Sequence, residues 1–244
     1  MFSSKDIIII LASENNFSNL IIPPHCPDDG LSLGLIEFLR QHYKQEPFEK
    51  TNFPFWQDDY SPKREPSDET ILKTAEWLAQ GKIIGWYQGN GELGPRALGN
   101  RSILMNPTIH NGKHIINQKV KKREWFRPFA PVCREQDKEI YFDDAYNAEY
   151  MSYAPFVKDE YRNKLPSITH VDGTARLQTV NQEQHNLFYS ILTCMDQRKK
   201  IPVILNTSFN IKGRPILTTL KDAFYVLDNT ELDFLVVENL LIIK

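Results

Sequence analysis

The sequence predicts an α/β protein in which helices pack against a sheet. Helix-like and strand-like segments alternate along most of the chain, as in this fold class. Residues 182–199 place apolar side chains at 187, 188, 191, 192 and 195, the spacing of one helix face. The apolar runs at 83–87 and 202–205 have the length of buried strands. With 244 residues, of which 41% are hydrophobic, the chain can bury an ordinary core as one large domain or two small ones.

The first 66 residues predict separate elements and a linker. Residues 6–11 and 19–22 are expected to form short strands. Residues 31–40 are expected to form a helix, because apolar side chains recur there at 31, 35, 38 and 39. Residues 45–66 are rich in Pro, Asp and aromatic side chains and follow neither period, which predicts a surface linker.

The helix and strand signals become regular from residue 67 onward. Ser67 is the expected N-cap of a helix with Asp68 and Glu69 in its first turn, and Gly81 ends it. The loop after strand 83–87 therefore follows a helix–strand unit, the usual setting for a ligand site in an α/β sheet. Further strands are expected at 102–105, 129–133, 150–157, 202–205, 234–237 and 240–243. Further helices are expected at 108–118, 135–141, 182–199 and 220–228, with two arms of a turn at 168–172 and 175–180 around Gly173.

Composition points to a cytoplasmic protein without a membrane partner. No apolar run approaches the roughly 20 residues needed to cross a bilayer, and the N-terminus lacks the pattern of a secretory signal. The three cysteines, Cys26, Cys133 and Cys194, lack CxxC spacing, which is typical of reduced thiols. His110 and His114 share a helix face, but without a neighbouring carboxylate we expect a surface pair and no protein metal site.

Basic side chains concentrate between residues 92 and 134 in a chain whose formal net charge is -2. Only Glu92 and Glu124 are acidic there, whereas the basic residues are Arg96, Arg101, Lys113, Lys119, Lys121, Lys122, Arg123, Arg127 and Arg134. Glycines at 89, 91, 94 and 99 allow backbone amides to approach a ligand closely. Guanidinium and ammonium groups suit phosphate and carboxylate anions, so we expect an anionic partner. The alternative is an ordinary solvated basic face.

Four separated motifs stand out between residues 94 and 210: GPRALGNRS at 94–102, REWFRPFAP at 123–131, THVDGTAR at 169–176 and NTSFN at 206–210. Together and in this order they resemble the C-terminal domain of the O-carbamoyltransferases of nodulation and antibiotic tailoring. The resemblance implies a YrdC-like twisted mixed sheet with flanking helices at 67–244 and a linker at 51–66. It also implies that residues 1–50 are a short remnant of an N-terminal domain of the actin and sugar-kinase type of ATPase fold. One departure stands at 90–93, where NGEL replaces the family's usual Arg-Met-Glu-Phe, so that one basic contact is lost and Glu92 is kept.

The resemblance also assigns roles to individual residues. Phosphate and carbamoyl contacts are expected from Arg96, Arg101, Arg127 and Arg176. A second resemblance, to the nucleotide-binding tetrad of the YrdC-type threonylcarbamoyladenylate synthases, is carried by Lys121, Arg123, Ser208 and Asn210. The alternatives are two solvated charges for Lys121 and Arg123, which would share a face of an extended segment, and turn capping for Ser208 and Asn210.

His170 and Asp172 are the candidates for ordering the site or moving a proton. Their spacing of two places them on one face of an expected strand, and a carboxylate can orient an imidazole that exchanges a proton near neutral pH. The alternative is a histidine satisfied in the core by a hydrogen bond.

The resemblance implies a carbamoyltransferase module that binds ATP and carbamoyl phosphate. It would form carbamoyladenylate, with release of pyrophosphate, for transfer to a hydroxyl acceptor with an ATPase-like partner polypeptide or a missing domain. Mg²⁺ is expected with ATP, held by Asp172 or by a phosphate oxygen. One alternative is a non-catalytic nucleotide- or phosphate-binding regulatory module. A nucleic-acid partner is disfavoured, because the pI is about 6.3 and the basic residues alternate with Pro and Gly instead of lining one helix.

Overall fold

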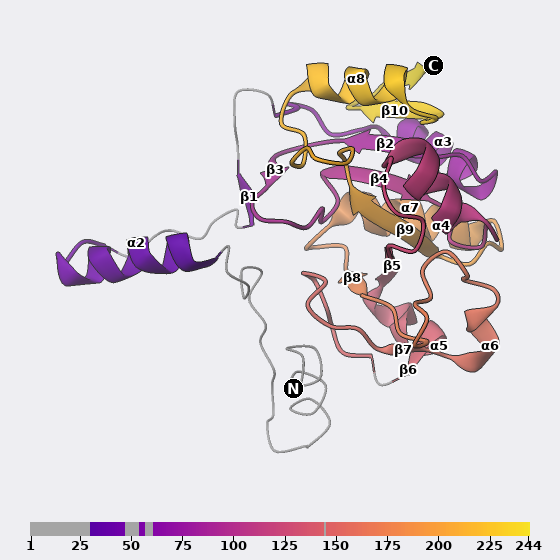
Figure 1. Cartoon of the computed structure of the whole chain (residues 1–244), viewed down its shortest axis with the longest axis horizontal. Helices are drawn as coiled ribbons and strands as arrows, with labels where there is room; N and C mark the ends of the chain where they lie inside the picture. The colour runs from indigo at the N-terminus through magenta and orange to yellow at the C-terminus, as the bar shows by residue number, and fades with distance from the viewer. Residues whose placement is uncertain (1–29, 47–53, 57–60, 144) are drawn as a thin grey trace.

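The computed structural model describes residues 30–46, 54–56, 61–143 and 145–244. The strands expected at 6–11 and 19–22 lie outside these residues. Helix α2, Leu31–His42, matches the helix expected at 31–40, and none of its residues is buried. In Figure 1 it extends away from the rest of the described chain. Among the described helices, none combines the length and apolar character that crossing a membrane requires.

A seven-stranded mixed sheet forms the centre of the fold (Figure 1), with the strand order β11-β10-β2-β4-β9-β5-β8. The pairs β10–β2 and β5–β8 are parallel, and the other neighbours are antiparallel. Strand β9 lies between β4 and β5, although both precede it by a long stretch of chain. The strands are β2 (Ile84–Tyr87), β4 (Arg101–Met105), β5 (Ala130–Arg134), β8 (Gln178–Val180), β9 (Val203–Ser208), β10 (Phe234–Val237) and β11 (Leu240–Ile243).

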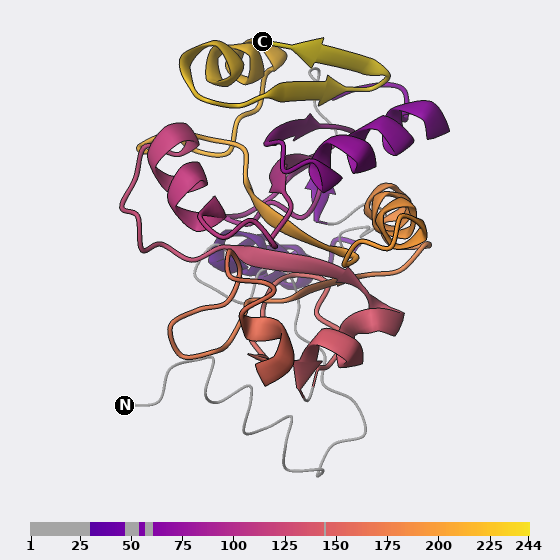
Figure 2. The ribbon, with the colours of Figure 1, turned by 90° about the vertical axis from the view of Figure 1, so that its right-hand side faces the viewer.

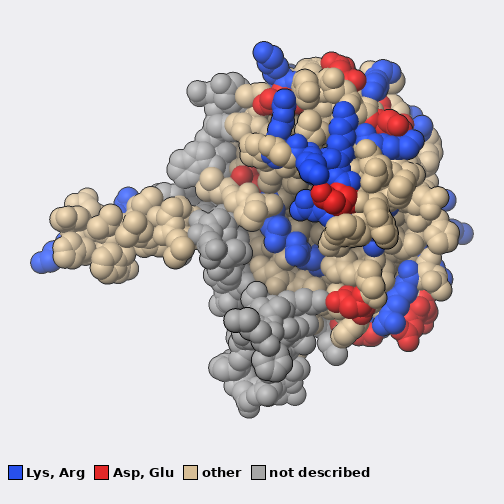
Figure 3. Space-filling view, viewed as in Figure 1, with Lys and Arg blue, Asp and Glu red and all other residues tan. Residues whose placement is uncertain are grey.

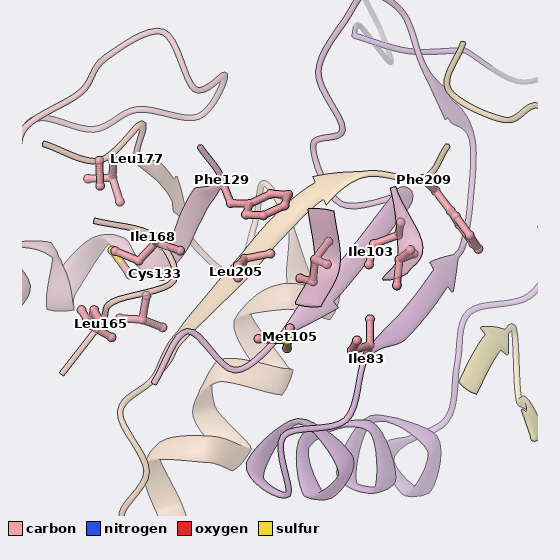
Figure 4. Packing of buried hydrophobic residues seen from close by; sticks show 14 of the residues in the cluster. Ile83, Ile103, Met105, Phe129, Cys133, Leu165, Ile168, Leu177, Leu205 and Phe209 are labelled. Carbon is pink, nitrogen blue, oxygen red and sulfur yellow. The ribbon is translucent and has the colours of Figure 1, made fainter. Parts of the chain in front are cut away.

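Helices cover both faces of the sheet, as Figure 2 shows. Helices α3 (Asp68–Ala79) and α7 (Asn186–Gln197) pack on one face, and their buried side chains join a cluster that includes Ile84, Leu104 and Ile204. The other face carries α8 (Leu220–Asn229) and the short helix α4 (Gly112–Ile115), which continues as the π-helix η2 (Ile116–Val120). Ile103, Met105 and Leu205 point to this second face (Figure 4). The alternation is the period of two that a strand imposes.

Local signals in the sequence set the ends of the main helices. Ser67 is the N-cap of α3, and its Oγ accepts from the Thr70 amide at 3.4 Å. Gly81 follows the helix with φ of +80°, the left-handed conformation that ends many helices. Thr219 and Asp222 form a capping box at the start of α8.

Several predicted elements are shorter than expected or lie elsewhere. The helix expected at 108–118 begins at Gly112, because Asn106 Oδ1 accepts from the Thr108 amide at 3.0 Å and bends the chain into a turn. Of the strand expected at 150–157 only β7 (Phe156–Val157) forms, paired with β6 (Phe142–Asp143). The expected linker contains β1 (Phe55–Trp56), paired with β3 (Gly91–Glu92). The remaining short helices are η3 (Glu135–Asp137), α5 (Lys138–Tyr141) and α6 (Asp159–Arg162).

Candidate functional site

A cavity of about 630 Å³ opens where β9 ends and β5 begins. Its lining contains no Asp or Glu among the described residues. Seven lining side chains are basic: Arg96, Lys121, Arg123, Arg127, Arg176, Lys212 and Arg214. Figure 3 shows Lys and Arg side chains gathered on the face turned to the viewer. A concave site with many cations and no internal carboxylate is suited to an anionic ligand.

The structure brings Lys121 together with Ser208 and Asn210. Lys121 follows η2 and is only 2% exposed. Its Nζ donates to the Ser208 carbonyl oxygen at 2.6 Å, to Ser208 Oγ at 3.0 Å and to Asn210 Oδ1. Burial, followed by the charges of Arg123 and Arg127, holds the pKa of Lys121 well below its ordinary value. An anion entering the cavity would stabilise this buried ammonium group.

Arg123 lines the same cavity, but not from the extended segment that we expected. The chain turns at Lys122, whose φ is +51°, directly after Lys121 ends the π-helix. Arg123 Nε donates to Asn117 Oδ1 at 2.6 Å, and its guanidinium lies 4.9 Å from the centre of the Phe129 ring. Burial lowers the pKa of Arg123 to about 10. The pair therefore shares the cavity through a turn, not through a common strand face.

Asn117 holds the 123–127 loop in place, a role that no sequence pattern indicated. Its Nδ2 donates to the carbonyl oxygens of Trp125 at 3.0 Å and Arg127 at 2.9 Å, while Oδ1 accepts from Arg123. A fully buried amide that makes three contacts fixes the loop relative to η2. In the sequence, Asn117 is one polar residue among several in a predicted helix.

Arg96 and Arg176 form a second group of cations in the cavity. Arg96 comes from the loop after β3, and Arg176 follows the turn at Gly173. Arg176 remains open to solvent, yet desolvation by the surrounding chain and then the charge of Arg96 lower its pKa. Neither guanidinium forms an ion pair with a carboxylate in the part of the chain that the structure describes. Two neighbouring cations without a counter-ion favour an anion between them.

Arg101 lies outside the cavity, in contrast to its predicted contact with substrate. It is 1% exposed and points toward the core, where its guanidinium lies 3.8 Å from the centre of the Tyr87 ring. Its Nη1 donates to the carbonyl oxygens of Gln88 at 2.6 Å, Gly89 at 3.1 Å and Asn100 at 3.2 Å. Arg101 therefore ties the two ends of the 88–100 loop together.

His170 lines the cavity, whereas Asp172 does not, and both lie in a tight turn, not on a strand. The His170 amide donates to the Thr174 carbonyl oxygen at 2.8 Å and closes the turn. Thr174 Oγ1 donates to Asp172 Oδ1 at 2.6 Å and lies 3.2 Å from His170 Nδ1. Thr174, which the sequence did not single out, connects the two predicted residues.

The Thr174 hydroxyl group thus contacts both His170 Nδ1 and the Asp172 carboxylate and fixes the position of the imidazole ring. Nε2 is buried. Burial lowers the pKa of His170, although the Phe129 backbone and the Asp172 carboxylate act in the opposite direction. His170 is therefore a neutral proton acceptor near pH 7.

Lys212 and Arg214 add two cations that were not assigned from the sequence. Lys212 Nζ donates to Glu124 Oε1 at 2.8 Å, and its amide donates to the Lys121 carbonyl oxygen at 2.9 Å. Arg214 stacks over the Tyr225 ring at 4.5 Å. The two Lys212 contacts join the 121–128 loop to the loop after β9. The signal was present in the sequence, since both cations directly follow NTSFN at 206–210.

The amides of the glycine-rich loop do not face the cavity as we expected. The amides of residues 98–101 all donate to the carboxylate of Glu92, so they are occupied inside the protein. These four amides are therefore not available to a ligand in the cavity.

A second cavity of about 700 Å³ lies on another side of the 88–100 loop. Its lining mixes charges of both signs, with Lys63 and Arg64 beside Glu65, Glu149 and Glu183. This balance gives it no preference for an anion. The described residues also contain no cluster of three His, Cys, Asp or Glu side chains placed to hold a metal.

Comparison with known proteins identifies the family. The family described as the carbamoyltransferase C-terminus matches residues 75–244. The chain belongs to this carbamoyltransferase family. The expectation from the four motifs is therefore confirmed, and the family is one of transferases.

Two curated carbamoyltransferase-family relatives show how much of a longer protein this chain covers. Nodulation protein NolNO of Sinorhizobium fredii is 37% identical over 247 residues, which cover 93% of this chain and 36% of NolNO. The 3'-hydroxymethylcephem-O-carbamoyltransferase of Streptomyces clavuligerus is 33% identical over 219 residues, covering 86% of this chain and 41% of the relative. The chain thus spans less than half the length of either relative.

A solved structure supports the fold of this carbamoyltransferase domain. The crystal structure of E. coli YciO superposes with a TM-score of 0.51 at 12% identity, covering 74% of this chain and 82% of YciO. At this identity the likeness concerns the fold alone. The predicted YrdC-like mixed sheet with flanking helices is confirmed.

Proposed function

We propose that the cavity binds carbamoyl phosphate and ATP together and produces carbamoyladenylate for transfer to a hydroxyl acceptor. Carbamoyl phosphate would be hydrolysed to carbamate and phosphate, and carbamate would displace pyrophosphate from ATP. The observation that carries the proposal is the cavity lining, in which two groups of cations meet without a carboxylate. Two polyanions repel each other in one site unless several cations offset the repulsion.

The two groups of cations suit the two substrates. In the proposal, Arg96 and Arg176 hold the phosphate and carbamoyl groups of carbamoyl phosphate, because paired guanidinium donors match a small tetrahedral or planar anion. Lys121, Arg123 and Arg127 hold the phosphates of ATP, with Ser208 and Asn210 completing that side. Since all three hydrogens of the Lys121 ammonium have protein acceptors in the present arrangement, a phosphate oxygen would take the place of one of them.

The residues present fit ATP, and they fit Mg²⁺ only as part of the nucleotide complex. Asn206 Oδ1 is buried at the edge of the cavity and has no hydrogen-bond partner among the residues that the structure describes, so it offers an acceptor to a ligand hydrogen. Asp172, the expected protein ligand of Mg²⁺, is occupied by Thr174 outside the lining. Phosphate oxygens would therefore hold the Mg²⁺, whose charge offsets theirs.

His170 is the proposed proton acceptor, and its pKa predicts how the activity falls at acidic pH. Because burial lowers its pKa from the ordinary 6.5, the imidazole remains neutral and able to accept a proton until the pH falls below that value. We expect the activity to be constant around pH 7 and to decline only below pH 6.5. The measurement is kcat/KM from roughly pH 5 to pH 8 for the wild type and for His170→Gln, which should be about 100-fold slower or more. A decline of the same shape in both proteins would remove His170 from the reaction.

Pyrophosphate exchange tests the proposed function as a whole. We expect radiolabelled pyrophosphate to enter ATP only when carbamoyl phosphate is present, since the exchange requires reversible formation of carbamoyladenylate. Thermal unfolding with ATP alone provides the comparison, because a ligand that binds the native state raises the Tm. A rise in Tm without exchange would favour the alternative, a nucleotide-binding regulatory module. Neither exchange nor a rise in Tm would contradict both.

The proposal includes a partner and a location. An ATPase-like domain, carried by a missing part of the protein or by a separate polypeptide, would complete the transfer, because carbamoyladenylate must be kept from water until it meets its acceptor. ATP and carbamoyl phosphate are cytoplasmic metabolites, so the proposal places the protein in the cytoplasm. Both cysteines in the described residues, Cys133 and Cys194, are free thiols, which is compatible with that compartment.

A further inference from the structure

Glu92 is the one carboxylate that contacts the 94–101 loop from within the described chain. Its Oε1 accepts from four consecutive amides, those of Leu98 at 2.9 Å, Gly99 at 3.1 Å, Asn100 at 2.8 Å and Arg101 at 3.1 Å. Its Oε2 is buried and has no hydrogen-bond partner among the described residues. Hydrogen bonds from amides to a carboxylate are roughly twice as strong as bonds between neutral groups. The four bonds therefore fix the course of the backbone from residue 98 to residue 101.

Four successive amides of the loop converge on one oxygen atom, as the amides of an anion-binding nest do. Gly99, within this segment, has φ of +125°. A Cβ at this position would lie 2.1 Å from His185 Nε2, so only glycine fits. In other proteins such a concavity holds a phosphate. Here the chain fills it with its own carboxylate.

Only Ala97 separates Arg96 from the fixed segment 98–101. The carbonyl oxygen of Ala97 accepts from Asn206 Nδ2 at 3.1 Å, and the carbonyl oxygen of Leu98 accepts from Gln178 Nε2 at 2.9 Å. Asn206 lines the cavity, so these bonds set the distance between the loop and the cavity wall. Arg96 itself forms no ion pair with a described residue. Its position therefore depends on the backbone that follows it.

We propose that Glu92 is a positioning residue that holds Arg96 in place for the anionic substrate. This inference rests on the proposed function for the identity of the substrate, but it requires only that Arg96 binds an anion. A residue that acts through Arg96 should change the affinity for an anion at Arg96 and leave nucleotide binding at Lys121 unchanged. A carboxylate that contributes only to stability would change both or neither.

The experiment is a double-mutant cycle read by direct titration with inorganic phosphate. Glu92→Gln keeps the shape of the side chain but replaces the carboxylate with one neutral acceptor oxygen and one NH2 donor, so the phosphate affinity is expected to fall about 10-fold, with less than a 2-fold change in ATP affinity. Arg96→Ala should reduce phosphate affinity at least as much. The double variant should bind phosphate no more weakly than Arg96→Ala alone, because Glu92 would have nothing left to position.

Hydrogen exchange supplies a readout independent of binding. The amides of residues 98–101 are expected to exchange about 10-fold faster in Glu92→Gln than in the wild type, since their acceptor is weakened. If Glu92→Gln does not fold, Glu92→Asp replaces it in the same cycle, because it retains the charge but moves it back by one methylene group.

Asp233→Asn is the matched control. The carboxylate of Asp233 is also half-buried and accepts from a backbone amide, that of Ile83 at 2.8 Å, but it does not line the cavity. This variant should lose stability without a change in phosphate affinity. Additive effects of Glu92→Gln and Arg96→Ala, or unchanged phosphate affinity in Glu92→Gln, would overturn the inference. A non-additive cycle in a protein that shows no pyrophosphate exchange would support the role of Glu92 and contradict the proposed function alone.

Discussion

Replacing Lys121 with methionine is expected to remove measurable nucleotide binding while the chain remains folded. Loss of one charge-assisted contact with phosphate, together with the disordering of Ser208 and Asn210, should weaken ATP binding about 100-fold or more, equivalent to about 2.7 kcal/mol. Folding should suffer little, because two effects oppose each other. Three acceptors lose their donor, but a buried cation whose pKa is lowered in the folded state, and which therefore opposes folding at neutral pH, is also removed. The measurements are isothermal titration with ATP and thermal unfolding with and without ATP.

Lys119→Met is the control for this variant. Lys119 lies two positions before Lys121, within the π-helix that Lys121 follows, but its side chain is exposed and pairs with Glu231 at 2.7 Å. We expect ATP affinity close to that of the wild type, because the pair lies outside the cavity lining. If Lys121→Met bound ATP as tightly as Lys119→Met does, the assignment of Lys121 to the nucleotide would be wrong.

Arg176→Ala is expected to slow carbamoyl-phosphate-dependent pyrophosphate exchange about 100-fold or more, the usual cost of removing one group that stabilises charge in a transition state. Its neighbour Arg96 would remain, but a single guanidinium cannot hold both ends of the anion. ATP affinity, measured separately by titration, should change little, since Arg176 interacts with Arg96 and not with the Lys121 group.

The control for Arg176 is Arg198→Ala. Arg198, directly after α7, is also an arginine outside the core, but it pairs with Glu76 at 3.3 Å and does not line the cavity. Its removal should lower stability modestly and leave the exchange rate unchanged. Equal exchange rates in the two variants would show that Arg176 does not take part in the reaction.

The sequence predicted the parts of this fold whose signals are local. The N-cap at Ser67, the apolar face of α7 and the strand that delivers NTSFN all follow from short-range patterns, and the structure has each of them. The expected helix at 108–118 was displaced because Asn106 forms a turn with Thr108, and continues as a π-helix that the apolar period does not distinguish from an α-helix. Hydrophobic periodicity predicts single strands and does not predict the order in which they pair in the sheet.

The candidate site was predicted where a motif fixes both residue and direction. Lys121, Ser208 and Asn210 meet as expected, because β9 and η2 end at the same place. Arg101 was predicted to contact substrate, but the alternation of side chains along β4 turns it toward Tyr87. The motif alone does not show which face of the strand a given residue occupies. Thr174 and Asn117 act through contacts with the backbone and with other side chains, and no sequence pattern predicts such contacts.

The insertion of β9 between β4 and β5 has a consequence for how the protein is made. As the ribosome releases the chain, β2, β4, β5 and β8 emerge before the strand that unites them. Until then Lys121 has neither Ser208 nor Asn210 to accept its hydrogens, although most cationic residues of the cavity have already been synthesised. Pairings between distant parts of a chain form slowly, since a long loop must close first. A nascent chain stalled before residue 203 would therefore carry four of the five cavity arginines, all except Arg214, without the cavity.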